Sequence, residues 1–291
     1  MRVVDDYTEV PAYEILPATA PRTPFVFSAP HSGDVYTRDL LACSQLDRQT
    51  IRRSEDTFVD RVFERVVELG APLLRANFPR AYVDLNRAPN ELDPEMFSGP
   101  LDLPVALESP RVAGGLGVIA RVVGDRQEIY GDRLPPAEAI RRLDRLYHPY
   151  HQALTGLIAE TVDRFGTCVL VDCHSMPSGA VKAHQPEARC DVILGDRFGT
   201  SCASALADSF ARHMRRQGLT PGLNRPYAGG YITEHYGRPP IVHAVQIELN
   251  RALYPMAGRI GSRVGRDQTV FVGQVHADHL EAFYELFRDV L

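Results

Sequence analysis

Short apolar runs that predict buried strands alternate with helical patterns along most of this chain, and this alternation constrains the fold most strongly. The apolar run at residues 168–171 is one such strand, and it leads directly into Asp172 and His174. Alternating strands and helices predict an α/β sandwich with a mostly parallel or mixed sheet and helices on both faces. No internal repeat or shift in composition divides the chain, so we expect a single domain over residues 1–291.

The clearest helix is predicted over residues 54–70. Ser54 is a good N-cap, apolar side chains recur with helical spacing after it, and Gly70 ends the pattern. A second helix is predicted over 136–165, where Pro149 marks a start, a kink or a break. The other predicted elements are strands at 25–27, 168–174, 190–196 and 243–251, a strand, turn and strand at 71–87, a long Gly- and Pro-rich segment with little regular structure at 90–136, a helix at 201–217, a Gly-rich turn at 227–237 and a helix from about residue 274.

Four of the predicted strands end in side chains that can carry chemistry. Ligands of open α/β sheets bind beyond the carboxyl ends of the strands, so we expect these side chains to form one site. Taken singly, each of them is more simply explained as a polar group with a structural partner. The side chains are His31 after the first strand, Asn86 and Arg87 after the second, Asp172 and His174 after the third, and Glu248, Asn250 and Arg251 after the last.

Charge and composition exclude several classes of function. The formal net charge is −5 and the pI is about 6.1, without the excess of Lys and Arg that a nucleic-acid-binding surface needs. The sequence has neither a basic amphipathic helix nor an apolar run of membrane-spanning length, and its first residues do not resemble a signal peptide. The five cysteines form no close pair, which argues against a disulfide framework or a structural zinc site. We expect a soluble, cytoplasmic protein.

The polar side chains at the strand ends fit one kind of chemistry. Two histidines and a carboxylate that leave one position open suit a catalytic zinc ion. A further glutamate can serve as general base for the attacking water, and arginines match the carboxylates of an anionic substrate. These residue types therefore predict metal-assisted hydrolysis of an amide in an anionic substrate.

Eight short motifs follow one another over about residues 25–255: APHSG, EDTFVDRV, PRAYVDLNR, HPYHQAL, VDCHSMPS, GDRFGTSC, GGYITEHYG and VQIELNRALY. In the order and spacing of these motifs the chain resembles the N-formylglutamate amidohydrolase family. The resemblance implies a three-layer α/β/α sandwich of the phosphorylase/hydrolase-like kind, similar to zinc carboxypeptidases and the aspartoacylase group. It also implies a zinc-dependent hydrolase, with one zinc ion per chain, that cleaves N-formyl-L-glutamate to formate and glutamate in histidine degradation.

Within this resemblance, His31 and His174 look like the two imidazole ligands of the metal. The third ligand, a carboxylate, can be Asp56 or the adjacent Glu55. Asp34 stands three residues after His31, where zinc carboxypeptidases carry their carboxylate, but the family pattern requires no acid there. We therefore expect Asp56 to be the ligand, although an acid before a helix is equally explained by the helix dipole.

The resemblance makes Glu248 the general base. A carboxylate within an apolar strand needs a partner, so Glu248 can instead be a buried ion-pair partner of Arg251 or Arg87. Asp172 lies two residues before His174 on the same strand face and can orient an imidazole. Arg87 is also expected to act in catalysis by polarising the scissile carbonyl. The candidate substrate-binding residues are Arg80, Asn86, Arg87, His151, Tyr231 and Arg251.

Two other functions remain open at this point. A thiol hydrolase could use Cys173 as its nucleophile, although neighbouring residues of a strand point to opposite faces and separate Cys173 from His174. A non-catalytic protein that binds a metal or an amino acid could keep the same pocket. The expected partner is a small anionic N-acyl amino acid, with no nucleic acid or membrane. The acyl group, the amino acid, the native metal and the oligomeric state are not readable from the residues.

Overall fold

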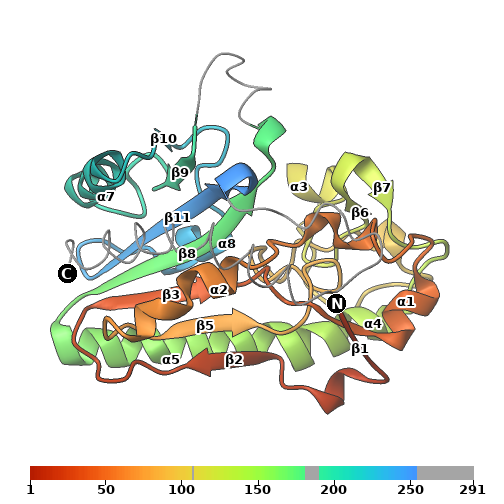
Figure 1. The fold of residues 1–291 in the computed structure, drawn as a ribbon. Coiled ribbons are helices and arrows are strands. Elements are labelled where there is room, and N and C mark those ends of the chain that lie inside the picture. The colour runs from red at the N-terminus through yellow and green to blue at the C-terminus, as the bar shows by residue number, and fades with distance from the viewer. Residues whose placement is uncertain (107, 181–189, 254–291) are drawn as a thin grey trace, which may run out of the picture. The chain divides into compact units, whose positions relative to one another are not determined.

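A computed structural model describes residues 1–106, 108–180 and 190–253, so the helix predicted from about residue 274 lies outside the described residues. The fold is mixed α/β, with a mostly parallel central sheet flanked by helices (Figure 1), and the predicted fold class is confirmed. Seven strands form this sheet in the order β10-β9-β11-β8-β3-β5-β2. Its strands are β2 (Tyr13–Leu16), β3 (Phe25–Ala29), β5 (Leu73–Ala76), β8 (Cys168–Met176), β9 (Val192–Gly195), β10 (Pro221–Leu223) and β11 (Val242–Asn250).

Smaller strand pairs and the helices complete the described chain. Strand β1 pairs in parallel with β4, and β6 pairs antiparallel with β7. These strands are β1 (Arg2–Val4), β4 (Val35–Thr37), β6 (Val122–Val123) and β7 (Gln127–Glu128). The α-helices are α1 (Arg38–Cys43), α2 (Val59–Phe63), α3 (Pro110–Ala113), α4 (Pro136–Arg142), α5 (His148–Phe165), α7 (Ser204–Arg216) and α8 (Tyr231–Tyr236).

Strands β8 and β11 pair in parallel over nine residue pairs. All nine residues of β8 are buried, as its apolar run predicts for a strand covered on both faces. The register sets Glu248 beside His174 and Gln246 beside Asp172. Because alternate residues of a strand point to the same face, these four side chains share one face of the sheet.

The contacts of the chain divide it into two compact units. The first comprises Met1–Ile15, Ala29–Thr57 and Leu74–Leu157, and the second comprises Leu16–Ser28, Phe58–Leu73 and Ile158–Leu291. The second unit contains strands β8 to β11 of the central sheet. The single domain over residues 1–291 stays a prediction.

The helix predicted over 54–70 begins later and is interrupted. The chain leaves a 3-10 turn at Ser54 and adopts a left-handed conformation at Phe58, with φ of 67°, and α2 begins only at Val59. A second 3-10 turn follows it over Glu64–Val67. The acidic residues at 55–56 therefore lie in extended chain before the helix, and the helix dipole does not explain their position.

The helix predicted over 136–165 is present, with an interruption before Pro149. Helix α4 passes into a π-helical turn over Leu143–Tyr147, in which the N–H of His148 donates to the Leu143 carbonyl, and α5 continues from there. Pro149 itself has no N–H to donate, which is compatible with a change of hydrogen-bond pattern just before it. The predicted break is thus a change of helix type.

Residues 82–85 do not form the predicted strand. The segment from Arg80 to Arg87 is irregular, with turns at residues 80–82 and 85–86, and its residues 81–86 are all buried. Tyr82, Val83 and Leu85 supply the apolar content that favoured a strand, but they fill the core from an irregular backbone. The described residues of 90–136 fit the prediction, because their regular structure consists of short helices and two-residue strands.

The Gly-rich turn predicted at 227–237 contains helix α8. Gly230 is the N-cap and Gly237 the C-cap of this helix, and Ile232 and Thr233 are buried between them. Gly229, just before the helix, has φ of 120°, and a side chain there would meet Thr233 Oγ1. The glycines thus delimit a short helix, which the sequence pattern alone did not distinguish from a turn. None of the helices within the described residues is both long and apolar enough to span a membrane.

Candidate active site

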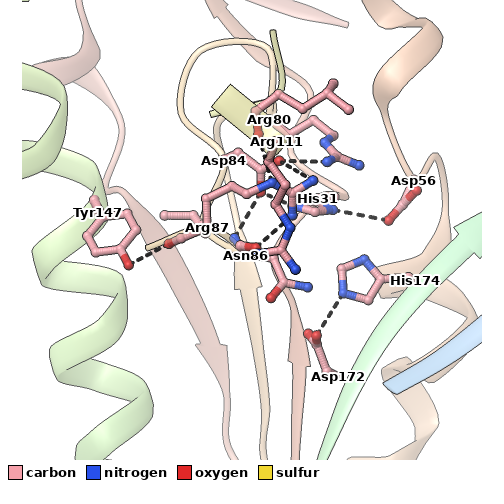
Figure 2. Close-up of polar contacts among 12 residues, drawn as sticks. His31, Asp56, Arg80, Asp84, Asn86, Arg87, Arg111, Tyr147, Asp172 and His174 are labelled. Carbon is pink, nitrogen blue, oxygen red and sulfur yellow. Dashed lines mark hydrogen bonds and ion pairs between the residues drawn. The ribbon is translucent and has the colours of Figure 1, made fainter. Parts of the chain in front are cut away.

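His31 lies in the turn that follows β3, between two carboxylates. Its Nε2 donates to Asp84 Oδ1 at 2.7 Å, and its Nδ1 lies 3.4 Å from Asp56 Oδ2 (Figure 2). The backbone N–H of Asp56 also donates to the carbonyl of His31, at 3.0 Å, which ties the two loops together. All three side chains are buried. A carboxylate on Nε2 fixes the tautomer and directs Nδ1 toward Asp56, as a metal-ligating imidazole requires.

Asp84 anchors a buried network of charges. Its Oδ2 accepts from Arg80 Nη2 at 2.6 Å and lies 3.8 Å from Arg87 Nη2, while its Oδ1 also accepts from the N–H of Asn86 at 2.9 Å (Figure 2). Burial alone would raise the pKa of Asp84, but the guanidinium groups of Arg80 and Arg87 and the nearby His31 outweigh it and hold the pKa well below its usual range. Asp84 is therefore an anion at neutral pH.

The two adjacent acids Glu55 and Asp56 have different partners. Glu55 accepts a 2.6 Å hydrogen bond from the hydroxyl of Tyr36 and pairs with Arg52 at 3.0 Å, so its carboxylate is engaged away from His31. Burial, followed by the Glu55 charge, raises the pKa of Tyr36, which therefore keeps its proton and remains a donor. Asp34, the third candidate, has a side chain that is 54% exposed and accepts from the N-terminal amine. Of the three acids, Asp56 is the one beside His31.

The imidazole of His174 is held in the same way by its own strand. His174 Nε2 donates to Asp172 Oδ2 at 2.9 Å, and both residues are buried on β8 (Figure 2). Cys173 points to the opposite face of the strand, where its thiol donates to the carbonyl of Val171. Burial, with a smaller effect from Asp172, raises the pKa of the Cys173 thiol well above its ordinary value. The thiol is thus kept protonated and is a poor nucleophile.

Glu248 is brought to His174 by the pairing of β11 with β8. Its carboxylate is 7% exposed and accepts a 2.8 Å hydrogen bond from Gln246 Nε2. Gln246 occupies the position beside Asp172 in the same register. The sheet therefore presents an amide–carboxylate pair next to a carboxylate–imidazole pair.

Within the described residues, His31, Asp56 and His174 form a buried group that could hold a metal ion, since one ligand atom from each lies within 4.8 Å of the others. The donor set of two imidazoles and one carboxylate is typical of zinc and related divalent ions. Each imidazole also donates its Nε2 proton to a carboxylate, Asp84 for His31 and Asp172 for His174, which is the usual support of metal-ligating histidines. The residues present fit such an ion.

The remaining candidate residues have the following neighbours. His151 Nε2 donates to the carbonyl of Leu85 at 3.0 Å, and its ring lies 4.3 Å from that of Tyr147. Tyr231 stacks on His235 at 4.9 Å between ring centres, with 3.2 Å between its hydroxyl and Nδ1. Arg251 Nε donates to Ser175 Oγ at 3.1 Å.

The half-buried guanidinium of Arg87 has two of its nitrogens bound to backbone carbonyls. Its Nε donates to the Leu116 carbonyl and its Nη1 to the Asn86 carbonyl, both at 2.8 Å. Burial lowers the pKa of this guanidinium, although Asp84 opposes the shift. Among the described residues its Nη2 reaches only Asp84, at 3.8 Å, which is beyond hydrogen-bond distance.

Sequence reasoning missed Asp84 and Gln246 as functional candidates. Asp84 stands within PRAYVDLNR, two residues before the predicted site residue Asn86. The usable signal was a carboxylate in an otherwise apolar stretch, which must be paired. Glu248 within β11 carries the same signal as Asp84.

A mixed α/β fold with a buried His–Asp–His group and a carboxylate behind each imidazole defines a class of hydrolase-like proteins that can hold a metal ion. Comparison with known proteins identifies the family. The family model described as N-formylglutamate amidohydrolase matches residues 23–255, and the chain belongs to this family. The resemblance drawn from the eight motifs is confirmed.

Named relatives agree with this membership. An N-formylglutamate deformylase of Pseudomonas aeruginosa is 30% identical over 249 residues, which cover 83% of this chain and 85% of that protein. An N-formylglutamate deformylase of Pseudomonas putida is 25% identical over 253 residues, 80% of this chain and 82% of that protein. The crystal structure of an N-formylglutamate amidohydrolase from Ralstonia eutropha JMP134 has a TM-score of 0.84 at 32% identity and covers 97% of this chain and 98% of that one.

Proposed function

We propose that this protein is a metal-dependent amidohydrolase that converts N-formyl-L-glutamate and water to formate and L-glutamate. The observation that carries the proposal is the buried group of His31, Asp56 and His174 in a chain of the N-formylglutamate amidohydrolase family. These three residues would hold the metal, and zinc is the ion we expect. The two named deformylase relatives support the choice of substrate.

A bound divalent ion would supply a Lewis acid that polarises the acyl carbonyl and lowers the pKa of water. Glu248 is the general base of this proposal: it accepts the proton of the attacking water and delivers it to the departing amine. The hydrogen bond from Gln246 Nε2 holds one carboxylate oxygen of Glu248 in place. Asp84 and Asp172 hold the imidazoles of His31 and His174 in their tautomers.

The substrate of this reaction carries two carboxylates, which cationic and amide side chains of the site would bind. Arg87 Nη2 is aimed at a substrate oxygen, because its other two nitrogens are already bound to carbonyls. Arg80, Asn86 and Arg251 are the further anion-binding candidates, and Tyr231 lines the pocket in this proposal, whereas His151 Nε2 donates to the Leu85 carbonyl. Guanidinium groups suit carboxylates because their geometry allows two parallel hydrogen bonds.

The thiol alternative is less well supported than the metal-dependent one. Cys173 is fully buried, and its thiol faces away from the side of β8 that carries Asp172 and His174. A nucleophilic cysteine needs a lowered pKa, whereas the pKa of Cys173 is raised. We also propose that the protein works in the cytoplasm, as part of histidine degradation, where its five free cysteines stay reduced.

The proposal is tested by measuring the metal content of the purified protein together with hydrolysis of N-formyl-L-glutamate before and after chelation. We expect about one zinc ion per chain, loss of activity on chelation and recovery when zinc is added. Bound metal without hydrolysis of this compound would refute the substrate. Full activity in a metal-free protein would refute the reaction class.

The variant Glu248→Gln tests the general base separately. We expect it to keep its metal and lose at least about a hundredfold in kcat, the range attributed to general acid–base catalysis. Glu234→Gln is the matched control, because the Glu234 side chain is 54% exposed on α8 and forms an ion pair with Arg197 at 2.9 Å. Equal kcat values for the two variants would remove Glu248 from this role.

A further inference from the structure

The segment from Arg80 to Arg87 carries much of the candidate site but has no regular secondary structure of its own. Its buried backbone carbonyls cannot be left without hydrogen-bond donors, and no sheet ladder supplies them. Four of these carbonyls instead accept from side chains of residues far along the chain. The backbone of the site therefore depends on side chains that lie outside it.

The first half of the segment is held by Arg142, at the end of α4. Its Nη1 donates to the Tyr82 carbonyl at 3.1 Å and to the hydroxyl of Tyr130 at 2.7 Å, and that hydroxyl donates to the Ala81 carbonyl at 3.4 Å. The guanidinium is buried and lies 4.2 Å from the centre of the Tyr82 ring. This arrangement fixes both the backbone and a side chain of the segment.

The second half is held by two residues of the following helix. The Tyr147 hydroxyl donates to the Arg87 carbonyl at 2.7 Å (Figure 2), and His151 Nε2 donates to the Leu85 carbonyl at 3.0 Å. A carbonyl can only accept, so the proton of His151 is on Nε2. The two rings pack 4.3 Å apart, which keeps both donors in place.

The π-helical turn brings these donors onto one side of the helix. Arg142 and Tyr147 are five residues apart, and in a regular α-helix they would point about 140° apart. The π turn over Leu143–Tyr147 accommodates one extra residue, so that the two point only about 40° apart, like residues four apart in an α-helix. His151 follows Tyr147 by four residues and continues the same face.

We propose that Tyr147 and His151 are positioning residues, which hold the backbone of residues 85–87 so that the Arg87 guanidinium and the Asp84 carboxylate meet their partners. Arg142 does the same for Ala81 and Tyr82. This inference rests on the proposed function for its catalytic consequence, and it assigns His151 to the backbone of the site in place of a contact with substrate. The π turn is the feature of the helix that makes this arrangement possible.

The experiment compares His151→Leu and His151→Gln in the full-length, metal-loaded protein, using steady-state kinetics and hydrogen exchange of the segment followed by mass spectrometry. Loss of the donor in His151→Leu should speed exchange in peptides that contain Asp84 and Asn86, whose amides donate to the Val118 carbonyl and to Asp84 Oδ1. It should lower kcat by about tenfold to a hundredfold, because displacements of about 1 Å have effects of this size, with KM changed by less than about twofold.

The amide of glutamine offers a donor in place of Nε2, so His151→Gln should recover most of the kcat and of the slow exchange. His213→Leu is the matched control: His213 is also half-buried and donates a ring N–H to a carbonyl, that of Ser209 at 2.8 Å, but within α7. We expect this control to leave kcat unchanged and to leave hydrogen exchange unchanged in the peptides of residues 81–88.

Two results would overturn the inference. One is a rise in KM for His151→Leu with unchanged exchange of the segment, which would mean that His151 contacts the substrate. The other is equally faster exchange throughout the chain, which would mean that the hydrogen bond supports overall stability only. The exchange measurement needs no substrate. An inactive wild-type protein would therefore refute the proposed function, and hydrogen exchange would still decide whether His151 holds the segment.

Discussion

Replacing Asp84 by asparagine removes a single negative charge from the centre of a buried network. The two oxygens of Asp84 serve different partners: Oδ1 accepts from His31 and from the N–H of Asn86, whereas Oδ2 accepts from Arg80 and lies near Arg87. An asparagine side chain has one oxygen and one NH2 group. In Asp84→Asn the NH2 group therefore faces either the N–H groups of His31 and Asn86 or the guanidinium groups of Arg80 and Arg87, and in both cases donor meets donor.

The expected loss of stability follows from these contacts. A hydrogen bond to a charged group contributes about 1.5–3 kcal/mol, and removal of one partner of a buried ion pair costs about 3–5 kcal/mol. Because the Arg80 side chain is 23% exposed, water can solvate part of the unpaired guanidinium. We therefore expect the free energy of unfolding to fall by about 3 kcal/mol, at the low end of that second range.

The assay is equilibrium unfolding in urea at pH 7, on protein treated with a chelator so that metal binding does not contribute. Asp39→Asn is the control, because the Asp39 side chain is 43% exposed and forms a 2.7 Å ion pair with Arg141, worth less than about 1 kcal/mol at the surface. Losses of equal size in the two variants would refute the argument that burial makes the Asp84 network strong.

The difference in the free energy of unfolding between wild type and Asp84→Asn should depend on pH, and its direction follows from the pKa of Asp84. Burial raises the pKa of Asp84, but Arg80, Arg87 and His31 outweigh it, so the folded-state pKa lies below the unfolded one. The stabilisation is therefore complete above the ordinary carboxyl pKa of about 4 and is lost as the pH falls below it. We expect the gap between wild type and Asp84→Asn to stay constant from pH 7 to about 5 and to shrink in more acidic buffer.

Further predictions concern two glycines and a thiol. Gly33→Ala should destabilise the protein by about 1–3 kcal/mol in urea unfolding, because its Cβ would lie 2.2 Å from the Phe78 carbonyl oxygen. Gly156→Ala should stabilise it by about 0.5–1 kcal/mol, since Gly156 lies inside α5 with nothing within 4 Å of the added carbon; a loss there would contradict the helix. Because burial raises the pKa of Cys173, iodoacetamide at pH 8 should neither label it in the native protein nor reduce activity, as mass spectrometry and assay would report.

The central strands could be predicted from the sequence because their side chains leave few alternatives. A run such as residues 168–171 is apolar on both faces, as a strand covered on two sides requires, and all nine residues of β8 are buried. Asp172 and His174 at its end are two residues apart, so their side chains point to the same face of the sheet. The same reasoning gave β3 and β11, and with them the positions of His31 and Glu248.

Other parts could not be predicted, because local composition does not distinguish their alternatives. Residues 82–85 are as apolar as a strand, but their carbonyls find side-chain donors such as Arg142 and His151, which no local pattern reveals. The left-handed residue Phe58 delays α2, although Ser54 had the features of an N-cap. In both regions the backbone conformation depends on residues distant in the sequence.

The parallel pairing of β8 with β11 has a consequence for how this chain can change. Nine consecutive residue pairs fix the register, and side chains of adjacent residues alternate between the two faces. One residue inserted at the start of β11 would turn Glu248 away from His174 and present Ile247 in its place, with the composition of the strand almost unchanged. A change of length in one of these two strands would therefore need a matching change in the other to keep Glu248 beside His174. Length variation among functional relatives should fall outside both strands.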